Sequence, residues 1–426
     1  MGVRGGWLDH DGGMVREGDL SYRQMSVLTL PTIGLSVCLS LVATYLPLLL
    51  SRYTSSATLI GVAIGGEGLF ALAIPLVVGS LSDRVWTRWG RRRPFMMLGA
   101  PIMAAAIFLA PFQPGYLPIA ATTFLFFAAY HLYSAPYQAL IPDLAPPHQQ
   151  GRVQGFQTMM RGAGMFLGMV IAGYLFESWE PLPFILAAFL MVGVTYVAVA
   201  SIEESASSID APPVLGGLRA SLTDIWRTTR REKTIMRLLA ANLLWESTIQ
   251  GIRPFIMLYF LYVLGTSTMM GATLLGLVGI VYIVAGLSGG FLADRYGRER
   301  ILWTGLWIYL VGCSIGFFVR DLRLGLVLLP IFGLGGSLVL TLPYTVMMTL
   351  MPRDRIGQFT GLFSVSRGAA TVIAPVIFGA GIDAATAMMG QVRGYAIIWP
   401  LAAAAIVVSI FLYRAVTSSQ RAAAAA

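Results

Sequence analysis

Two carboxylates, Glu67 and Glu246, lie deep inside apolar stretches of the chain. An ionisable side chain at the centre of a membrane-spanning helix costs at least about 2.5 to 3.5 kcal/mol, so we expect each one to have a function. A carboxylate that alternates between protonated and charged forms can carry a proton, and we interpret both as candidate proton carriers. We expect the glycines beside Glu67 to leave room for water; they are Gly65, Gly66 and Gly68.

Arginines and tyrosines in the apolar stretches are the candidates for binding a substrate. Arg161 lies nine residues beyond Arg152, roughly 13 Å along a helix, and Arg367 is similarly deep. A guanidinium offers a rigid fork of donors, so this pair could hold the hydroxyls of a sugar or an anionic group. The alternative is that each arginine forms an internal salt bridge. Tyr137 and Tyr344 are candidate stacking platforms for sugar rings, or else packing residues.

One later stretch, residues 236–264, carries Asn242, Glu246 and Arg253 at spacings of four and seven residues. Such spacing places all three on one face of a helix, and we expect that face to contact a substrate. His131, in an earlier stretch, could relay protons because imidazole titrates near neutral pH. The alternative for His131 is a packing residue held by a hydrogen bond.

The composition predicts the scaffold that positions these residues. Of the 426 residues 57% are hydrophobic and 12% are charged, whereas a soluble domain has about 25% charged residues. The apolar runs are too long and continuous for the strands of a β-barrel. An all-α integral membrane protein is expected, with twelve transmembrane helices of about 20 residues or more. Their predicted ranges are 25–50, 57–80, 94–112, 117–142, 153–176, 181–201, 236–264, 270–292, 301–319, 323–350, 357–382 and 395–414.

The 29 Lys and Arg residues, which give a net charge of +9, fall mostly in alternate loops. This is the positive-inside pattern of a membrane protein, and it predicts that both termini are cytoplasmic. We therefore expect a lipid bilayer as the surroundings, in a plasma membrane such as the bacterial inner membrane, and no nucleic-acid partner. Cys38 and Cys313 lie within predicted spans, where neither a disulfide nor a metal site is expected.

Three short motifs occur twice, in the same order and at offsets of 211, 207 and 206 residues. Repetition at a nearly constant offset predicts two parallel six-helix repeats, residues 1–201 and 235–426, joined by a cytoplasmic linker at 202–234. The matching pairs are Gly79 and Asp83-Arg84 with Gly290 and Asp294-Arg295, Pro136-Tyr137 with Pro343-Tyr344, and Arg161-Gly162 with Arg367-Gly368.

The loop from Gly79 to Pro94, GSLSDRVWTRWGRRRP, is the most specific motif in the chain. It resembles the cytoplasmic motif between the second and third helices of the major facilitator superfamily. Its end, from Gly90 to Phe95, is similar to plant sucrose transporters and their animal and bacterial relatives, and more loosely to glycoside–pentoside–hexuronide cation symporters. The resemblance implies the major facilitator fold, with a substrate site at the midplane between the two halves.

This loop and its repeat are the candidate cytoplasmic gate. A glycine lets two helices approach closely, and an aspartate can accept hydrogen bonds at the N-terminus of a neighbouring helix. We expect the arginines to pair across to the other half and hold the cytoplasmic side shut; the alternative is a loop that only sets topology. The predicted gate residues are Gly79, Asp83, Arg84, Arg91, Arg92, Arg93, Gly290, Asp294 and Arg295.

A second resemblance to the sucrose-transporter group runs from Pro136 to Leu144, PYQALIPDL. It is similar to the family's segment ending Arg-Ala-Leu-Leu-Ala-Asp-Leu, which implies a role for Asp143 in proton coupling and sugar binding. Gln138 stands where the family has Arg, so it is a candidate substrate contact that departs from the sucrose pattern. The alternative for Asp143 is a solvated carboxylate at the membrane interface.

These features together predict a secondary active transporter working by alternating access, and no Walker loop or nucleophile elbow points to an enzyme. The leading interpretation is a proton-coupled sugar or glycoside symporter, with H⁺ as coupling ion, no cofactor and a monomeric chain. One alternative is a transporter or exporter of an organic anion or lipophilic cargo. Another is a transporter-like assembly or delivery factor for pigments or membrane complexes.

Overall fold

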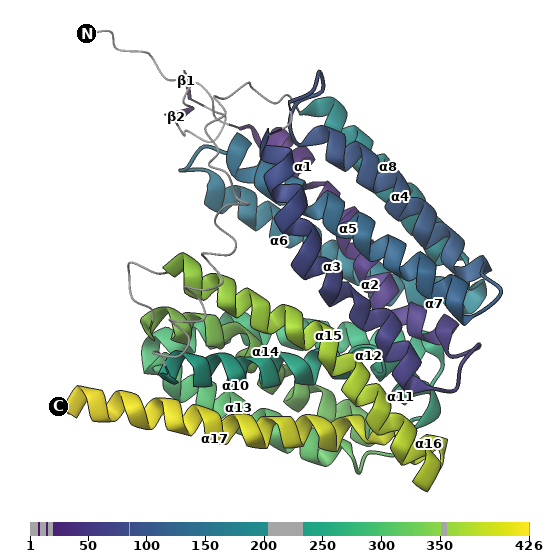
Figure 1. Ribbon diagram of the computed structural model, residues 1–426, viewed down its shortest axis with the longest axis vertical. Helices are drawn as coiled ribbons and strands as arrows, with labels where there is room; N and C mark the ends of the chain where they lie inside the picture. Colours follow the sequence, from purple (N-terminus) through teal and green to yellow (C-terminus); the bar gives the residue numbers. More distant parts are fainter. Residues whose placement is uncertain are drawn as a thin grey trace.

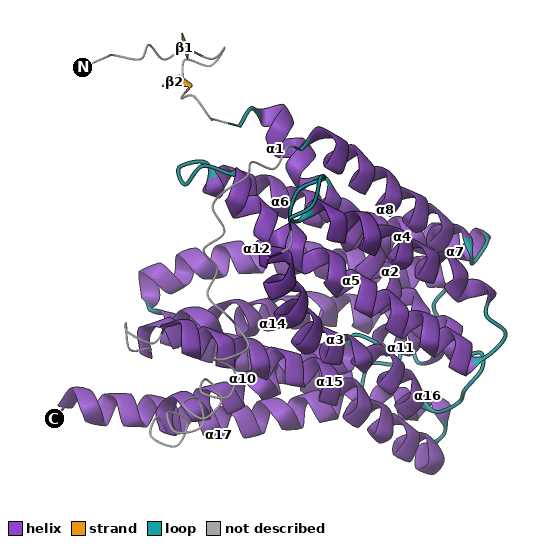
Figure 2. Ribbon diagram, turned by 45° about the horizontal axis from the view of Figure 1, so that its top comes forward, coloured by secondary structure: helices purple, strands orange, loops and turns teal. Residues whose placement is uncertain are grey.

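The computed structural model describes residues 7–8, 14–15, 20–84, 86–202, 233–350 and 356–425. Two short strands, β1 (Trp7–Leu8) and β2 (Met14–Val15), pair antiparallel, and the other regular elements described are helices (Figure 2). The predicted linker at 202–234 lies almost wholly outside the described residues, so the predicted domain boundaries stay a prediction.

The helices before this linker follow the predicted spans closely. A span of the membrane is made by one long helix or by consecutive shorter ones. Their bounds are α1 (Tyr22–Thr29), α2 (Pro31–Leu50), α3 (Ala57–Arg84), α4 (Arg93–Leu109), the 3₁₀ turn η1 (Ala110–Phe112), α5 (Tyr116–Leu144), α6 (Gln150–Phe166), the π-helical η2 (Leu167–Ile171), α7 (Ala172–Ser178) and α8 (Leu182–Ser201).

The helices after the linker repeat the same order. Their bounds are α10 (Lys233–Ile252), α11 (Ile256–Tyr262), α12 (Thr268–Tyr296), α13 (Arg298–Gly316), α14 (Leu322–Leu350), α15 (Ile356–Met389), α16 (Gln391–Ala396) and α17 (Ile398–Ala425). Among the described residues, ten helical segments are long and apolar enough to cross a membrane. Two of the twelve predicted spans do not meet this criterion: the span made by α10 and α11, and the span made by α13. Charged residues within them, such as Glu246 and Arg300, lower their mean hydropathy.

The predicted span at 236–264 is broken rather than continuous. Helix α10 ends at Ile252 and α11 begins at Ile256, with a turn between them. Pro254 explains the break, because proline has no backbone N–H and disfavours helical geometry in the residue before it. That residue is Arg253, so one of the candidate site residues lies on irregular backbone.

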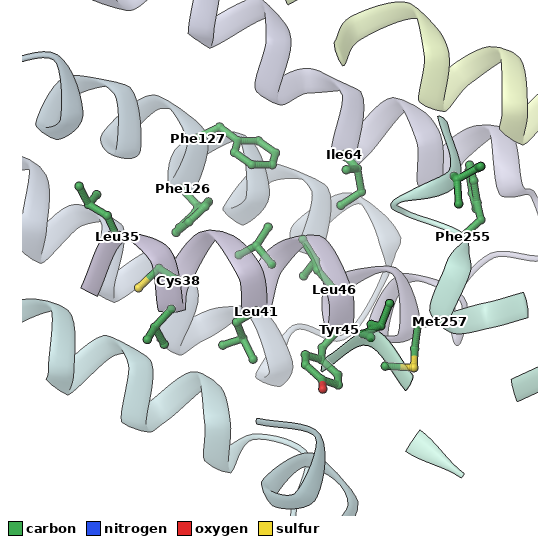
Figure 3. Packing of buried hydrophobic residues seen from close by; sticks show 14 of the residues in the cluster. Leu35, Cys38, Leu41, Tyr45, Leu46, Ile64, Phe126, Phe127, Phe255 and Met257 are labelled. Atoms are coloured by element: carbon green, nitrogen blue, oxygen red, sulfur yellow. The ribbon is translucent and has the colours of Figure 1, made fainter. Parts of the chain in front are cut away.

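Helix α2 forms the centre of the first group of helices. Cys38, Leu41 and Tyr45 are fully buried, and Figure 3 shows α2 among side chains from its neighbours, including Phe126 of α5 and Ile64 of α3. The Tyr45 hydroxyl donates to the carbonyl of Met169 in η2. In a bilayer such helices associate through close packing and internal hydrogen bonds, since lipid is as apolar as their side chains.

Helices α1–α8 lie together, and α10–α17 form a second group (Figure 1). We call these groups the first and second halves. The start of α1, the end of α17 and the loop at 86–92 lie on one side, here called the terminal side and predicted to be cytoplasmic. Residues 51–56 lie on the opposite side. The halves meet through α3 against α15 and through η2 and α7 against α12.

Among the described residues, close contact between α3 and α15 runs from the opposite side to the middle of the two helices. A Cβ at Gly61 of α3 would lie 2.2 Å from the carbonyl oxygen of Pro375 in α15, so the two backbones touch. Toward the terminal side, a Cβ at Gly79 of the same helix would meet no described atom within 4 Å, and Val77 is 64% exposed. The halves are therefore closed on the opposite side and separated on the terminal side.

This asymmetry predicts different outcomes for two glycine substitutions in α3. We expect Gly61→Ala to lower the free energy of unfolding by about 1 to 3 kcal/mol, because backbone atoms must move apart to admit the methyl group. Gly79→Ala, the matched control, has open space and gains helix propensity, so we expect it to be neutral or stabilising. Thermal unfolding in detergent measures both, and equal melting temperatures would contradict the close approach at Gly61.

Candidate functional site

Two carboxylate–arginine pairs lie in the middle of the helix assembly. Glu246 of α10 accepts a hydrogen bond from Nε of Arg367 in α15, at 2.9 Å. The Glu246 side chain is 6% exposed whereas that of Arg367 is 59% exposed. The pair thus joins a buried anion to an arginine whose outer nitrogens remain accessible.

Asn242 strengthens the same junction one helical turn earlier. Its Nδ2 donates to Oγ of Ser366 at 2.8 Å, beside Arg367 on α15. Asn242 and Glu246 therefore point to the same neighbouring helix, as their spacing of four residues predicts. Arg367 therefore forms an internal salt bridge in this conformation, which is the alternative that the sequence left open for the two deep arginines.

The second pair crosses between the halves. Nη1 of Arg253, in the turn after α10, lies 3.8 Å from Oε2 of Glu67 in α3. Both side chains are partly exposed, and Tyr130 of α5 lies within electrostatic range of both and of Arg161. The centre of the interface therefore gathers charged and polar groups from α3, α5, α6 and the turn at Arg253.

The prediction that the glycines around Glu67 leave room for water is wrong. Gly65 and Gly68 do not leave room for water, because a Cβ at either would lie less than 3 Å from a carbonyl oxygen of α15. Gly66 is likewise filled by the ring of Phe124. These glycines serve close helix approach, which is the usual role of small residues between helices in membranes.

Arg161, the repeat mate of Arg367, differs from it. The described residues show no carboxylate paired with Arg161, which lies on an exposed part of α6. The two arginines are thus related in sequence but not equivalent in contacts. Their joint role in holding a substrate stays a prediction.

Asp143 lies at the end of α5 on the terminal side, apart from the two central pairs. Its Oδ2 accepts from Nη2 of Arg91 at 2.8 Å and from Nε of Arg92 at 3.3 Å. Arg92 also donates to Oγ of Ser82 in α3, at 2.6 Å. Asp143 thereby fastens the loop at 86–92 to its own half, and its predicted part in proton coupling stays a prediction.

Arg91 and Arg92 contact Asp143, and Arg92 also contacts Ser82, all within the first half. The expected pairing of the arginine loop with the other half stays a prediction. Arg93 begins α4. The side chains of Asp83 and Arg84 lie outside the described residues, so their predicted gate role is untested.

The second copy of the gate motif is exposed on the terminal side. Asp294 lies 3.8 Å from Arg298 on the next helix and its side chain is 74% exposed. The guanidinium of Arg295 lies 5.4 Å from the ring of Tyr296. Gly290 has no described atom within 4 Å of its Cβ position, and the predicted gate role of this repeat stays a prediction.

The two tyrosines predicted to stack on sugar rings have different surroundings: Tyr137 is buried and Tyr344 is partly exposed. Tyr137 is 1% exposed, and its hydroxyl contacts Thr32 Oγ1 at 2.8 Å and the Leu28 carbonyl at 3.1 Å, so it packs inside the first half rather than stacking on a ligand. Tyr344 is only partly buried, 3.4 Å from Oγ1 of Thr360. Gln138 is exposed on α5.

His131 lies inside the first half, on α5. It is 9% exposed and its ring edge meets Tyr130 at a centroid distance of 5.1 Å. Its Nε2 is buried without a hydrogen-bond partner among the described residues. The predicted hydrogen-bonded packing alternative therefore lacks its hydrogen bond at that nitrogen, and the relay role stays a prediction.

Two carboxylates that the sequence reasoning missed join the halves on the opposite side. Asp383 of α15 and Glu177 of α7 each accept hydrogen bonds from the first residues of a helix in the other half. They are 206 residues apart, the offset that relates Arg161 to Arg367. Extending the repeat comparison to the ends of these helices would have found them.

A membrane-spanning assembly of two six-span halves, closed on one side and with paired charges at its centre, is a transporter architecture. The family model of the Major Facilitator Superfamily matches residues 30–375. The chain therefore belongs to the Major Facilitator Superfamily and is a multi-pass membrane transporter.

Known relatives agree on transport and differ in cargo. The chain is 23% identical over 356 residues to the "Multi-drug resistance efflux pump PmrA homolog" of Lactococcus lactis, covering 79% of this chain and 83% of that protein. It is 26% identical to the "Inner membrane symporter YicJ" of Escherichia coli (57% and 53% covered) and 27% identical to the "Lactose permease" of Lactobacillus helveticus (32% and 21% covered). The chain thus spans about half or less of these two.

A solved structure supports the fold. A bacterial homologue of the human lysosomal transporter Spinster, in an inward-facing and unoccupied conformation, superposes with a TM-score of 0.77 at 14% identity, covering 93% of this chain and 96% of that one. Similarity at this identity establishes the architecture alone.

Proposed function

We propose that this chain is a proton-coupled symporter that works by alternating access and carries a sugar or glycoside. The observation that carries the proposal is the Glu67–Arg253 pair, a carboxylate and a guanidinium facing each other across the two halves. A charge pair that must separate when the halves move, and whose anion can be neutralised by a proton, couples proton binding to that movement.

In the proposed cycle, protonation of Glu67 removes its attraction for Arg253 and accompanies substrate binding from the opposite side. Once the halves rock to separate on the terminal side, Arg253 lies beside Glu67 and its positive charge stabilises the charged carboxylate. The proton then leaves on the terminal side with the substrate. The observed conformation, with this pair formed and the terminal side separated, corresponds to the state after release.

The proposed substrate contacts are Arg161 and Arg367, one from each half. Nε of Arg367 is engaged by Glu246, and the exposed remainder of its guanidinium is free to donate to substrate hydroxyls. Similarity to a lactose permease favours a sugar, and similarity to a symporter favours coupled transport.

Uptake by the full chain in proteoliposomes tests the proposal. Labelled lactose and sucrose are the probes, with an inward proton gradient of about one pH unit and, as control, the same gradient collapsed by an uncoupler. We expect a sugar to accumulate only while the gradient is present. Equal uptake with and without the gradient would overturn proton coupling, and no uptake of either sugar would overturn the assignment of these sugars.

A second candidate is export of an organic anion or a lipophilic cargo. It is favoured by a relative that shares 356 residues with this chain and is named as a multidrug efflux pump. In the same vesicles, gradient-dependent transport of a fluorescent lipophilic dye, together with no sugar flux, would select this candidate.

A further inference from the structure

Asp383 of α15 binds the first turn of α3 in the other half. Its Oδ1 accepts from the backbone N–H of Ala57 at 2.6 Å. Its Oδ2 accepts from the N–H of Thr58 at 3.0 Å, from Oγ1 of Thr58 at 2.6 Å and from Oγ of Ser56 at 2.7 Å. One carboxylate thus receives four hydrogen bonds from three consecutive residues.

These bonds complete the capping of α3, whose local cap is a single bond from the N–H of Leu59 to Oγ of Ser56, at 3.3 Å. The first N–H groups of any helix have no partner within the helix, and the helix dipole makes this end favourable for a negative charge. An aspartate normally meets this need from the residue just before the helix. Here the anion comes from more than 300 residues away, so the bonds to Ala57 and Thr58 exist only while α3 and α15 are together.

Glu177 makes the corresponding contact in the other pair of helices. Its Oε2 accepts from the N–H of Met269, in the first turn of α12, at 2.8 Å. Met269 lies 211 residues after Thr58, the offset that relates Gly290 to Gly79, and Glu177 lies 206 residues before Asp383. Both partners of this contact are therefore repeat mates of the partners at Asp383.

The surrounding residues repeat in the same way. Four residues before each carboxylate stands a glycine at which the other half comes close: Cβ would lie 2.5 Å from the Ala57 carbonyl oxygen at Gly379, and 2.2 Å from Cβ of Ala272 at Gly173. Two arrangements related by the internal repeat, both crossing the interface on the same side, are unlike a chance contact of exposed side chains.

We propose that Asp383 and Glu177 form a two-point latch, in which a carboxylate from each half caps the first inward-running helix of the other half and holds the opposite side of the transporter closed. The latch must break whenever the halves separate on that side. Asp383, with four bonds, is the stronger point, and Glu177 is the weaker. This inference rests on alternating access but on neither the coupling ion nor the substrate.

A distance measurement without substrate tests the latch, so its failure is separate from that of the proposed function. Spin labels are placed on Leu117→Cys of α5 and Met388→Cys of α15, which are 75% and 85% exposed and lie on the opposite side, after both buried native cysteines are replaced by alanine. Asp383→Asn and Glu177→Gln keep the shape of each side chain and remove its charge. Pulsed electron resonance then gives the fractions with short and long separation.

We expect the long-separation fraction to rise relative to the short one, by about tenfold in Asp383→Asn and about threefold in Glu177→Gln. The control is Asp321→Asn, because Asp321 caps α14 of its own half through the N–H of Leu324, at 2.9 Å, on the same side. If Asp383→Asn does not fold, Thr58→Val removes a donor from the other partner and should shift the distances in the same direction.

Label-to-label distances that stay unchanged in Asp383→Asn, or in Thr58→Val if Asp383→Asn does not fold, would overturn the latch. A shift of equal size in Asp321→Asn would also overturn it, since any lost cap would then have the same effect. A shift at Asp383 with none at Glu177 would overturn its two-point form.

Discussion

Glu67→Gln is expected to abolish gradient-driven accumulation while leaving exchange of substrate across the membrane. Glutamine keeps the size and hydrogen-bonding capacity of the protonated acid, but it cannot release a proton when Arg253 approaches within 3.8 Å. A gradient of one pH unit supplies about 1.4 kcal/mol per proton, which is about tenfold accumulation. In Glu67→Gln this tenfold concentration ratio of substrate should fall to one, with equal concentrations on both sides of the membrane.

The measurement compares net uptake under a proton gradient with exchange of labelled for unlabelled substrate at equal pH. Asp321→Asn serves as the control variant, since Asp321 lies on the opposite side and accepts a hydrogen bond from Leu324 of its own half. Full accumulation by Glu67→Gln would remove Glu67 from the coupling mechanism. If Glu246→Gln instead gave exchange without accumulation, the proton site would move to the Glu246–Arg367 pair.

Local patterns in the sequence predicted the helices well. Continuous apolar runs define the spans because lipid requires each backbone group to bond within its own helix. The face shared by Asn242 and Glu246 follows from their spacing alone, and both do contact α15. These features depend on neighbours within about two helical turns, which a sequence displays directly.

The partners of the charged residues could not be predicted in the same way. Whether Arg253 meets Glu67 depends on how α3 and α10 approach each other, and on the break that Pro254 introduces. The glycines beside Glu67 illustrate the same limit, because a small residue fits a water-filled space and a close helix contact equally well. The partner of the arginine loop was likewise not predicted: Arg91 and Arg92 pair with Asp143, more than 50 residues later in the chain.

The repeat supplied more information than was first used. Comparing the halves at offsets of 206 and 211 residues identified Arg161 with Arg367 and Gly79 with Gly290. The same offsets relate Glu177 to Asp383 and Met269 to Thr58. Glutamate and aspartate are both carboxylates, so the offset pairs Glu177 with Asp383. Methionine and threonine differ in side chain, so the pairing of Met269 with Thr58 follows only from the contacts of their backbone N–H groups.

Arg367→Ala should destabilise the protein far more than Arg161→Ala, although the two positions are repeat mates. Loss of Arg367 leaves Glu246, whose side chain is 6% exposed, without its 2.9 Å partner. A buried charged group left unpaired costs about 1 to 3 kcal/mol. We expect a loss in the lower part of this range, because solvent screens Arg367, which is itself 59% exposed. Arg161 pairs with no carboxylate among the described residues, so its removal should cost under about 0.5 kcal/mol.

Thermal unfolding in detergent without substrate measures this difference, and the double variant Glu246→Gln with Arg367→Ala should recover part of the loss because no buried charge remains. Binding provides the second readout. If both arginines hold substrate, each alanine variant weakens binding, but only Arg367→Ala also lowers the melting temperature. Equal melting temperatures for the two variants would show that the Glu246–Arg367 pair contributes nothing to stability, and unchanged binding in both would remove the arginines from the substrate site.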